Sequence, residues 1–154
     1  MTAGTRTLAL VVTLVVSVVV AGPAAGQTRA QWAKAADVIC AREYAEIHAV
    51  QRSVYANPPK TIRGFARLLN AIITGMDRVH RGIAALPRPS SDRATIASML
   101  SSLGRMIKEL RLARDAALAR DRLGYAVHTE RGAALARQVD RLALRLGARV
   151  CANG

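Results

Sequence analysis

Aromatic side chains are scarce in this chain, which has one Phe, one Trp and three Tyr among 154 residues. Proteins that hold single-stranded nucleic acid stack its bases on aromatic rings. A chain with so few rings offers little surface for such stacking. We therefore expect no nucleic-acid partner, although the formal net charge is +13.

Motifs for catalysis, metal binding and cofactor attachment are missing as well. The chain has no Gly-x-Ser-x-Gly elbow, no glycine-rich phosphate loop and no Cys-x-x-Cys-His haem motif. It also lacks the Glu-x-x-His of di-iron bundles, and the nearest match, Asp77-x-x-His80, flanks an apolar seam. We expect no enzymatic activity, no metal and no cofactor. The core methionines are interpreted as flexible filler: Met76, Met99 and Met106.

No apolar run is long enough to cross a bilayer as a helix. The longest, residues 8–20, has 13 residues, whereas a transmembrane helix needs about 20. It follows Arg6 and is broken by Gly22 and Pro23, and small residues come next. This pattern predicts a signal peptide over residues 1–26, cleaved near Gly26, and a secreted or extracytoplasmic domain over residues 27–154. The alternative is an uncleaved segment that anchors the protein to the membrane.

Cysteine is limited to Cys40 and Cys151. In an exported chain, a single pair of cysteines indicates one disulfide. This bond would close a loop of more than a hundred residues, which is worth about 4–5 kcal/mol in the chain-entropy model. The alternatives are two free thiols or a bond between two molecules.

Four segments carry apolar residues at every third or fourth position, as on one face of an α-helix. We expect helices over residues 32–56, 62–86, 92–119 and 121–146. The most regular seam lies on the second segment: Ile62, Phe65, Leu69, Ile72, Met76, Val79, Ile83 and Leu86.

Polar residues and glycine are placed where helix ends need them. Thr61 and Asp121 are expected to cap the second and fourth helices, residues 90–92 to cap the third, and Gly147 to end the fourth. No Pro or Gly separates the third helix from the fourth, so one long bent helix is the alternative there.

Four helices of similar length with short links favour an all-α, antiparallel up-down-up-down four-helix bundle. In this topology the start of the first helix and the end of the fourth share one end of the bundle. Cys40 and Cys151 would then be close together. Gly75 and Gly82, on the flank of the second helix, predict that a neighbouring helix approaches closely.

Three short motifs stand out: Trp-x4-Asp-x2-Cys at residues 32–40, Ala-Leu-Pro-x-Pro-x-x-Asp-Arg at 85–93, and Leu-Gly-x-x-Val-Cys at 146–151. With these motifs the chain resembles a group of uncharacterised small exported helical proteins of high-GC Gram-positive bacteria. The resemblance implies export and an all-helical fold, and it implies no activity. Many members look like lipoproteins, whereas this chain has no cysteine near the cleavage point.

Three polar residues interrupt the apolar faces. Glu43 lies between Ile39 and Ile47 on the first helix, and His128 and Arg131 extend the apolar face of the fourth. A buried carboxylate must be paired, protonated or reach water. One interpretation is a small polar pocket inside the bundle. The other is structural, with an arginine partner for Glu43 and a fourth helix rolled so that Leu123 and Val127 face inward.

The fourth helix also carries a basic stripe, Arg137, Arg141 and Arg145. Arg137 has Asp140 nearby, but Arg141 and Arg145 have no acid three or four residues away. Other arginines have such neighbours, in the pairs Arg42–Glu46, Arg105–Glu109 and Arg111–Asp115. Uncompensated arginines are suited to a polyanion, and the alternative is an ordinary solvated face.

These observations predict an exported, non-enzymatic helical bundle that binds or scaffolds at the cell envelope. Its expected partners are anionic polymer or lipid head groups, because a domain that keeps 22 of the 23 basic residues and all ten acids carries +12. The alternative is a small-ligand carrier, or an enzyme, that uses an internal polar pocket.

Overall fold

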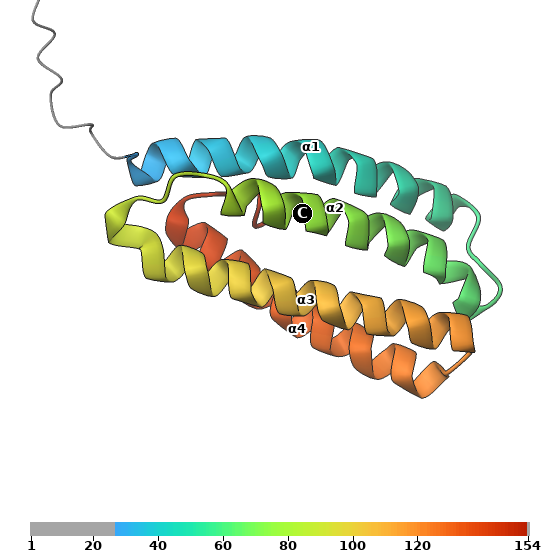
Figure 1. The fold of residues 1–154 in the computed structure, drawn as a ribbon. Helices are drawn as coiled ribbons and strands as arrows, with labels where there is room; N and C mark the ends of the chain where they lie inside the picture. The colour runs from blue at the N-terminus through green and yellow to red at the C-terminus, as the bar shows by residue number, and fades with distance from the viewer. Residues whose placement is uncertain (1–26, 154) are drawn as a thin grey trace, which may run out of the picture.

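The computed structural model describes residues 27–153, which form an all-α bundle whose consecutive helices run antiparallel (Figure 1). The predicted fold class is therefore confirmed. The predicted signal peptide, residues 1–26, lies outside the described residues. The elements are α1 (Arg29–Ala56), a 3₁₀ turn (Ile62–Phe65), α2 (Ala66–Ala84), a 3₁₀ turn (Ser90–Asp92), α3 (Arg93–Ala119) and α4 (Arg122–Leu146).

The first helix begins three residues before the predicted Trp32. Thr28 and Gln31 form a capping box, in which the N–H of Gln31 donates to Oγ1 of Thr28 and the N–H of Thr28 donates to Oε1 of Gln31. Glutamine in the third helical position supplies this reciprocal bond, so the helix starts one turn earlier than its apolar face does.

Two of the expected caps are not formed. Thr61 makes no side-chain cap bond, because the second helix opens with a 3₁₀ turn before α2 begins at Ala66. Asp92 does not cap α3 either. Its carboxylate accepts two hydrogen bonds from Nε and one from Nη2 of Arg29, at 2.6–3.1 Å, and so joins the start of α3 to the start of α1.

The boundary between the third and fourth helices is a sharp break. Arg120 takes a left-handed conformation with φ of 62°, and Oδ1 of Asp121 accepts the N–H of Gly124 at 2.9 Å. The predicted Asp121 cap is confirmed, and the long bent helix is excluded. Gly147 ends α4 with φ of 83°, as expected of a glycine C-cap.

The helices bury the predicted seams against one another. Two glycines on α2 allow α1 to come close, because a Cβ on Gly75 would lie 2.7 Å from Cδ1 of Ile47, and one on Gly82 would lie 3.0 Å from Cγ2 of Ile39. The side chains with at most 1% exposure include Trp32, Ile83, Ile96, Met99 and Leu146.

The helix pairs differ in the extent of their packing. α3 and α4 pack along most of their lengths, whereas α1 packs mainly on α2 and touches α4 over few residues. The tail after Gly147 adds contacts with α1, since it turns back toward this helix at the end of the bundle where the described chain begins (Figure 1).

A disulfide joins Cys40 of α1 to Cys151 of the tail, as predicted. No free cysteine is present among the described residues. A buried structural disulfide indicates an oxidising, extracytoplasmic location. None of the described helices combines the length and the apolar character needed to cross a membrane.

Candidate functional site

The basic stripe lies on the solvent side of α4, where Arg137, Arg141 and Arg145 are all exposed. Within the described residues, none of the three takes part in a salt bridge. Asp140 is half-buried on the same helix. Burial raises the pKa of Asp140, and the charge of Arg141 partly opposes this rise.

The carboxylates of the protein are mostly engaged elsewhere. Eight of the ten hold a hydrogen bond or ion pair away from the stripe: Asp37, Glu43, Glu46, Asp77, Asp92, Glu109, Asp115 and Asp121. Of the ten, this leaves Glu130 and Asp140, and both are on α4. Asp140 offsets part of the charge of Arg141, and with three arginines the stripe keeps a net positive charge.

The ion pairs predicted within single helices are not formed. The expected pairs were Arg42–Glu46, Arg105–Glu109 and Arg111–Asp115. The observed pairs include Arg42–Glu43, Arg78–Glu46, Arg111–Asp77, Arg114–Asp115 and His128–Glu109. Three of these cross between helices. Two do so because a long arginine side chain reaches a neighbouring helix as easily as the next turn of its own, and the third joins His128 of α4 to Glu109 of α3.

Glu43 is buried, with 2% of its surface exposed, as its place on the apolar face predicted. It accepts hydrogen bonds from Nε of Arg42 and from Nε of Arg78 on α2. Burial alone would raise the pKa of Glu43, but these hydrogen bonds outweigh it and hold the pKa below the usual value. The structural interpretation, an arginine partner, is the one that the geometry supports.

His128 and Arg131 do not join Glu43 in one cluster. Nδ1 of His128 lies 2.8 Å from Oε2 of Glu109, and Arg131 is exposed in a groove between α3 and α4. The predicted roll of the fourth helix is wrong for Leu123, which is 76% exposed, whereas Val127 is half-buried.

The bundle nevertheless contains a partly open cavity of about 100 Å³ among its four helices. Its polar side chains are Tyr44 and Asp140, and its apolar lining includes Met76, Met99 and Met106. The hydroxyl of Tyr44 donates to the carbonyl oxygen of the Cys151 peptide at 3.0 Å. Burial and the nearby carboxylates of Asp140 and Asp37 raise the pKa of Tyr44 to about 12, so it stays neutral at ordinary pH.

This cavity is small for a ligand site. Pockets that hold drug-sized molecules measure about 300–1,000 Å³. Tyr44 and Asp140 were missed from the sequence, because the helical pattern places them at the edge of the apolar faces and not within them. Among residues 27–153, no group of three or more His, Cys, Asp or Glu side chains is placed to hold a metal ion.

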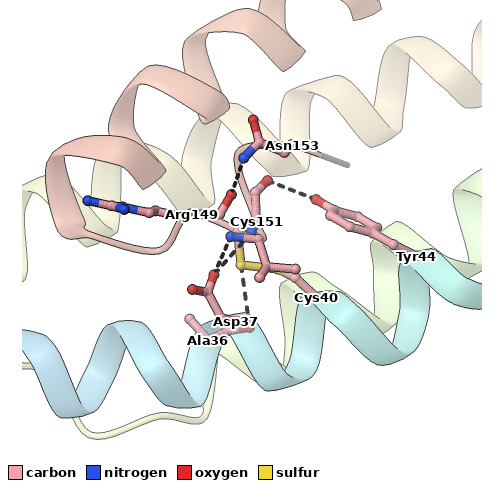
Figure 2. Close-up of a disulfide and its surroundings, with 8 residues drawn as sticks. Ala36, Asp37, Cys40, Tyr44, Arg149, Cys151 and Asn153 are labelled. Carbon is pink, nitrogen blue, oxygen red and sulfur yellow. Dashed lines mark hydrogen bonds between the residues drawn. A yellow bond between two sulfur atoms is a disulfide. The ribbon is translucent and has the colours of Figure 1, made fainter.

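Two of the sequence motifs meet at the disulfide (Figure 2). Oδ1 of Asp37 accepts the backbone N–H groups of Val150 and Cys151, at 2.8 and 3.1 Å. The bond from Tyr44 holds the carbonyl of Cys151 on the other side. Asp37, from the first motif, and Tyr44, one turn beyond it, therefore position the tail so that Cys151 faces Cys40, and both have structural roles.

No protein-family model, no curated protein and no solved structure matches this chain. The fold and the site define the protein as a small all-α bundle, closed by one disulfide and strongly basic on its surface.

Proposed function

We propose that this protein is an exported, non-enzymatic binding or scaffolding module that holds phosphate-bearing anions of the cell envelope through α4. The observation that carries the proposal is the exposed stripe of Arg137, Arg141 and Arg145, which has no salt-bridge partner among the described residues. Arginine donates in a planar fork that matches phosphate oxygens.

The alternative, a carrier for a small ligand, is favoured by the central cavity beside Tyr44 and Asp140. Its volume of about 100 Å³ restricts such a ligand to a few heavy atoms, since even drug-sized sites start near 300 Å³. The exposed basic face sets no limit on the size of its partner. We therefore rank binding at this surface above binding in the cavity.

The test measures binding of the exported protein to phosphatidylglycerol vesicles and to linear polyphosphate, at low and physiological salt. A variant with Arg137, Arg141 and Arg145 replaced by Gln is compared with a control in which Arg52, Arg67 and Arg81 are replaced by Gln. The three control arginines are exposed on α1 and α2 and form no salt bridge within the described chain.

Both variants lose three positive charges, so the comparison separates a site from a diffuse field. We expect the α4 variant to bind more weakly than the control, and binding to fall as the screening length shortens to about 8 Å at physiological salt. The proposal fails if the wild-type protein binds neither probe at low salt. It also fails if binding is insensitive to salt and to both sets of substitutions.

A further inference from the structure

A groove runs along the surface between α3 and α4. It consists of two adjoining depressions of about 510 and 340 Å³, and Arg105 and Gln138 line both of them. Lys108 and Arg131 line one half, and Ser101 with its neighbours lines the other. The α3 wall extends from residue 97 to residue 109, which corresponds to about 18 Å of helix.

The charge in this groove is predominantly positive. Arg105, Lys108 and Arg131 are exposed, and none forms a salt bridge with another described residue. The carboxylate of Glu109 is also in the lining, but it faces Nδ1 of His128 at 2.8 Å. Cations thus stand on both walls, two from α3 and one from α4.

The α4 wall connects this groove to the basic stripe. Arg131, Gln138 and Arg145 follow one another at intervals of seven residues, so they lie on one strip of the helix. Arg145 therefore continues the wall beyond the serine end of the groove. Arg137 lies farther round the helix, toward the outside, because each residue advances the helix by about 100°.

Large exposed apolar side chains avoid this groove. Within the described residues, the most exposed large apolar side chains include Leu123, Tyr55 and Val38. None of the exposed large apolar side chains lines either depression. A lipid surface is held by apolar insertion together with charge. A trough with cations on both walls and serine hydroxyls along it is shaped instead for a single extended chain of phosphates.

We infer that the α3–α4 groove binds an extended, linear phosphate-bearing polymer, with Arg105, Lys108 and Arg131 as its principal contacts. The inference rests on the proposed function, the binding of phosphate-bearing anions, but it places the principal contacts in the groove beside the stripe and specifies the form of the partner. The three side chains contact phosphate oxygens from both walls, and Arg145 extends the contact along the chain.

The test titrates the exported, disulfide-bonded protein with long-chain linear polyphosphate, with inorganic tripolyphosphate and with phosphatidylglycerol vesicles. The groove variant carries Arg105→Gln, Lys108→Gln and Arg131→Gln. The control carries Arg52→Gln, Arg67→Gln and Arg81→Gln, which removes the same charge from the other helix pair. Circular dichroism and the fluorescence of the buried Trp32 show whether each variant is folded.

We expect the groove variant to lose about tenfold or more in affinity for long-chain polyphosphate, and the control to lose much less. The loss of three phosphate contacts should also reduce the steepness of log affinity against log salt by about 2, because each contact with a single-stranded polyanion contributes about 0.7 to this slope. Because the groove holds several phosphates at once, the wild type should bind the long chain more tightly than tripolyphosphate.

A second pair of variants serves if the groove variant does not fold. Ser101→Glu places a negative charge in the groove, and Ser53→Glu places one on the exposed side of α1. Ser101→Glu should weaken binding more than Ser53→Glu.

Each other outcome has a separate meaning. Equal losses in the groove and control variants, with wild-type binding intact, refute the groove and leave the proposed function standing. Binding to vesicles without binding to polyphosphate, or equal affinity for tripolyphosphate and the long chain, refutes the extended polymer. Absence of wild-type binding to all probes refutes the proposed function itself.

Discussion

The disulfide should supply a large part of the stability of this bundle. Cys40 and Cys151 are 111 residues apart in the chain. In the chain-entropy model, closing a loop of this length stabilises the folded state by about 4.8 kcal/mol at 25 °C. Small domains have total stabilities of about 5–15 kcal/mol. Loss of the bond would therefore remove between a third and nearly all of the free energy of unfolding.

The perturbation is the double variant Cys40→Ala, Cys151→Ala, measured beside the reduced wild type. Both proteins lose the cross-link, but only the variant loses the buried sulfur atoms. The difference between their free energies of unfolding therefore measures how much the packing of the sulfur atoms contributes. Asp37 and Tyr44 still bind the tail through hydrogen bonds, and we expect both proteins to fold. Urea unfolding followed by the fluorescence of Trp32, the single tryptophan, reports the midpoint and the slope.

We expect the reduced protein to unfold at a markedly lower urea concentration and with a steeper dependence on urea. The slope should rise because an unfolded chain without the cross-link exposes more surface. If reduction lowers the free energy of unfolding by less than about 1 kcal/mol, the reasoning is refuted, because the predicted stabilisation comes mainly from the entropy of closing so long a loop. An unchanged slope would show that the bond does not restrict the unfolded chain.

Further predictions concern stability. Glu43→Leu should change stability by no more than about 1 kcal/mol, because both arginine partners of Glu43 reach water. Arg78→Met should lower the Tm clearly, because it leaves the buried carboxylate of Glu43 with only one arginine partner. A larger loss of Tm for Glu43→Leu than for Arg78→Met would contradict this. The guanidinium of Arg29 holds the pKa of Asp92 below its usual value, so this pair stabilises the fold above about pH 4, and the benefit disappears as pH falls through the folded-state pKa. Asp92→Asn should accordingly flatten the acid side of the Tm-against-pH curve, and an unchanged acid side would count against the pair. Arg120→Gly should stabilise by about 0.5–1 kcal/mol, because glycine relieves the left-handed backbone more than it adds entropy to the unfolded chain; destabilisation would argue that the side chain has a role of its own.

Local patterns predicted the helices well because local interactions form them. The seams on α2 and α3 and the ends of α4 follow from apolar spacing, Asp121 and Gly147, and these features need no knowledge of distant residues. The start of α1 was missed because the capping box of Thr28 and Gln31 lies outside the apolar face. The role of Asp92 was missed because its partner, Arg29, is 63 residues away.

The candidate site was harder to predict, because charged side chains choose their partners in three dimensions. Arg78 crosses from α2 to α1 to reach Glu43 and Glu46, and no spacing along one helix predicts this bond. The groove between α3 and α4 also depends on how two helices face each other. The exposure of Arg141 and Arg145, in contrast, was predictable from one helix alone.

The long covalent loop bears on how the molecule survives proteolysis. The segment between Cys40 and Cys151 contains α2, α3 and α4 in full. A protease that cuts the exposed link near Lys60, or the turn at Arg120, therefore releases no fragment, because both pieces stay joined through sulfur. We expect a nicked molecule to migrate as one band on a non-reducing gel and to separate into two only after a reductant is added. Damage at these links would thus leave the basic face of α4 attached to the rest of the bundle.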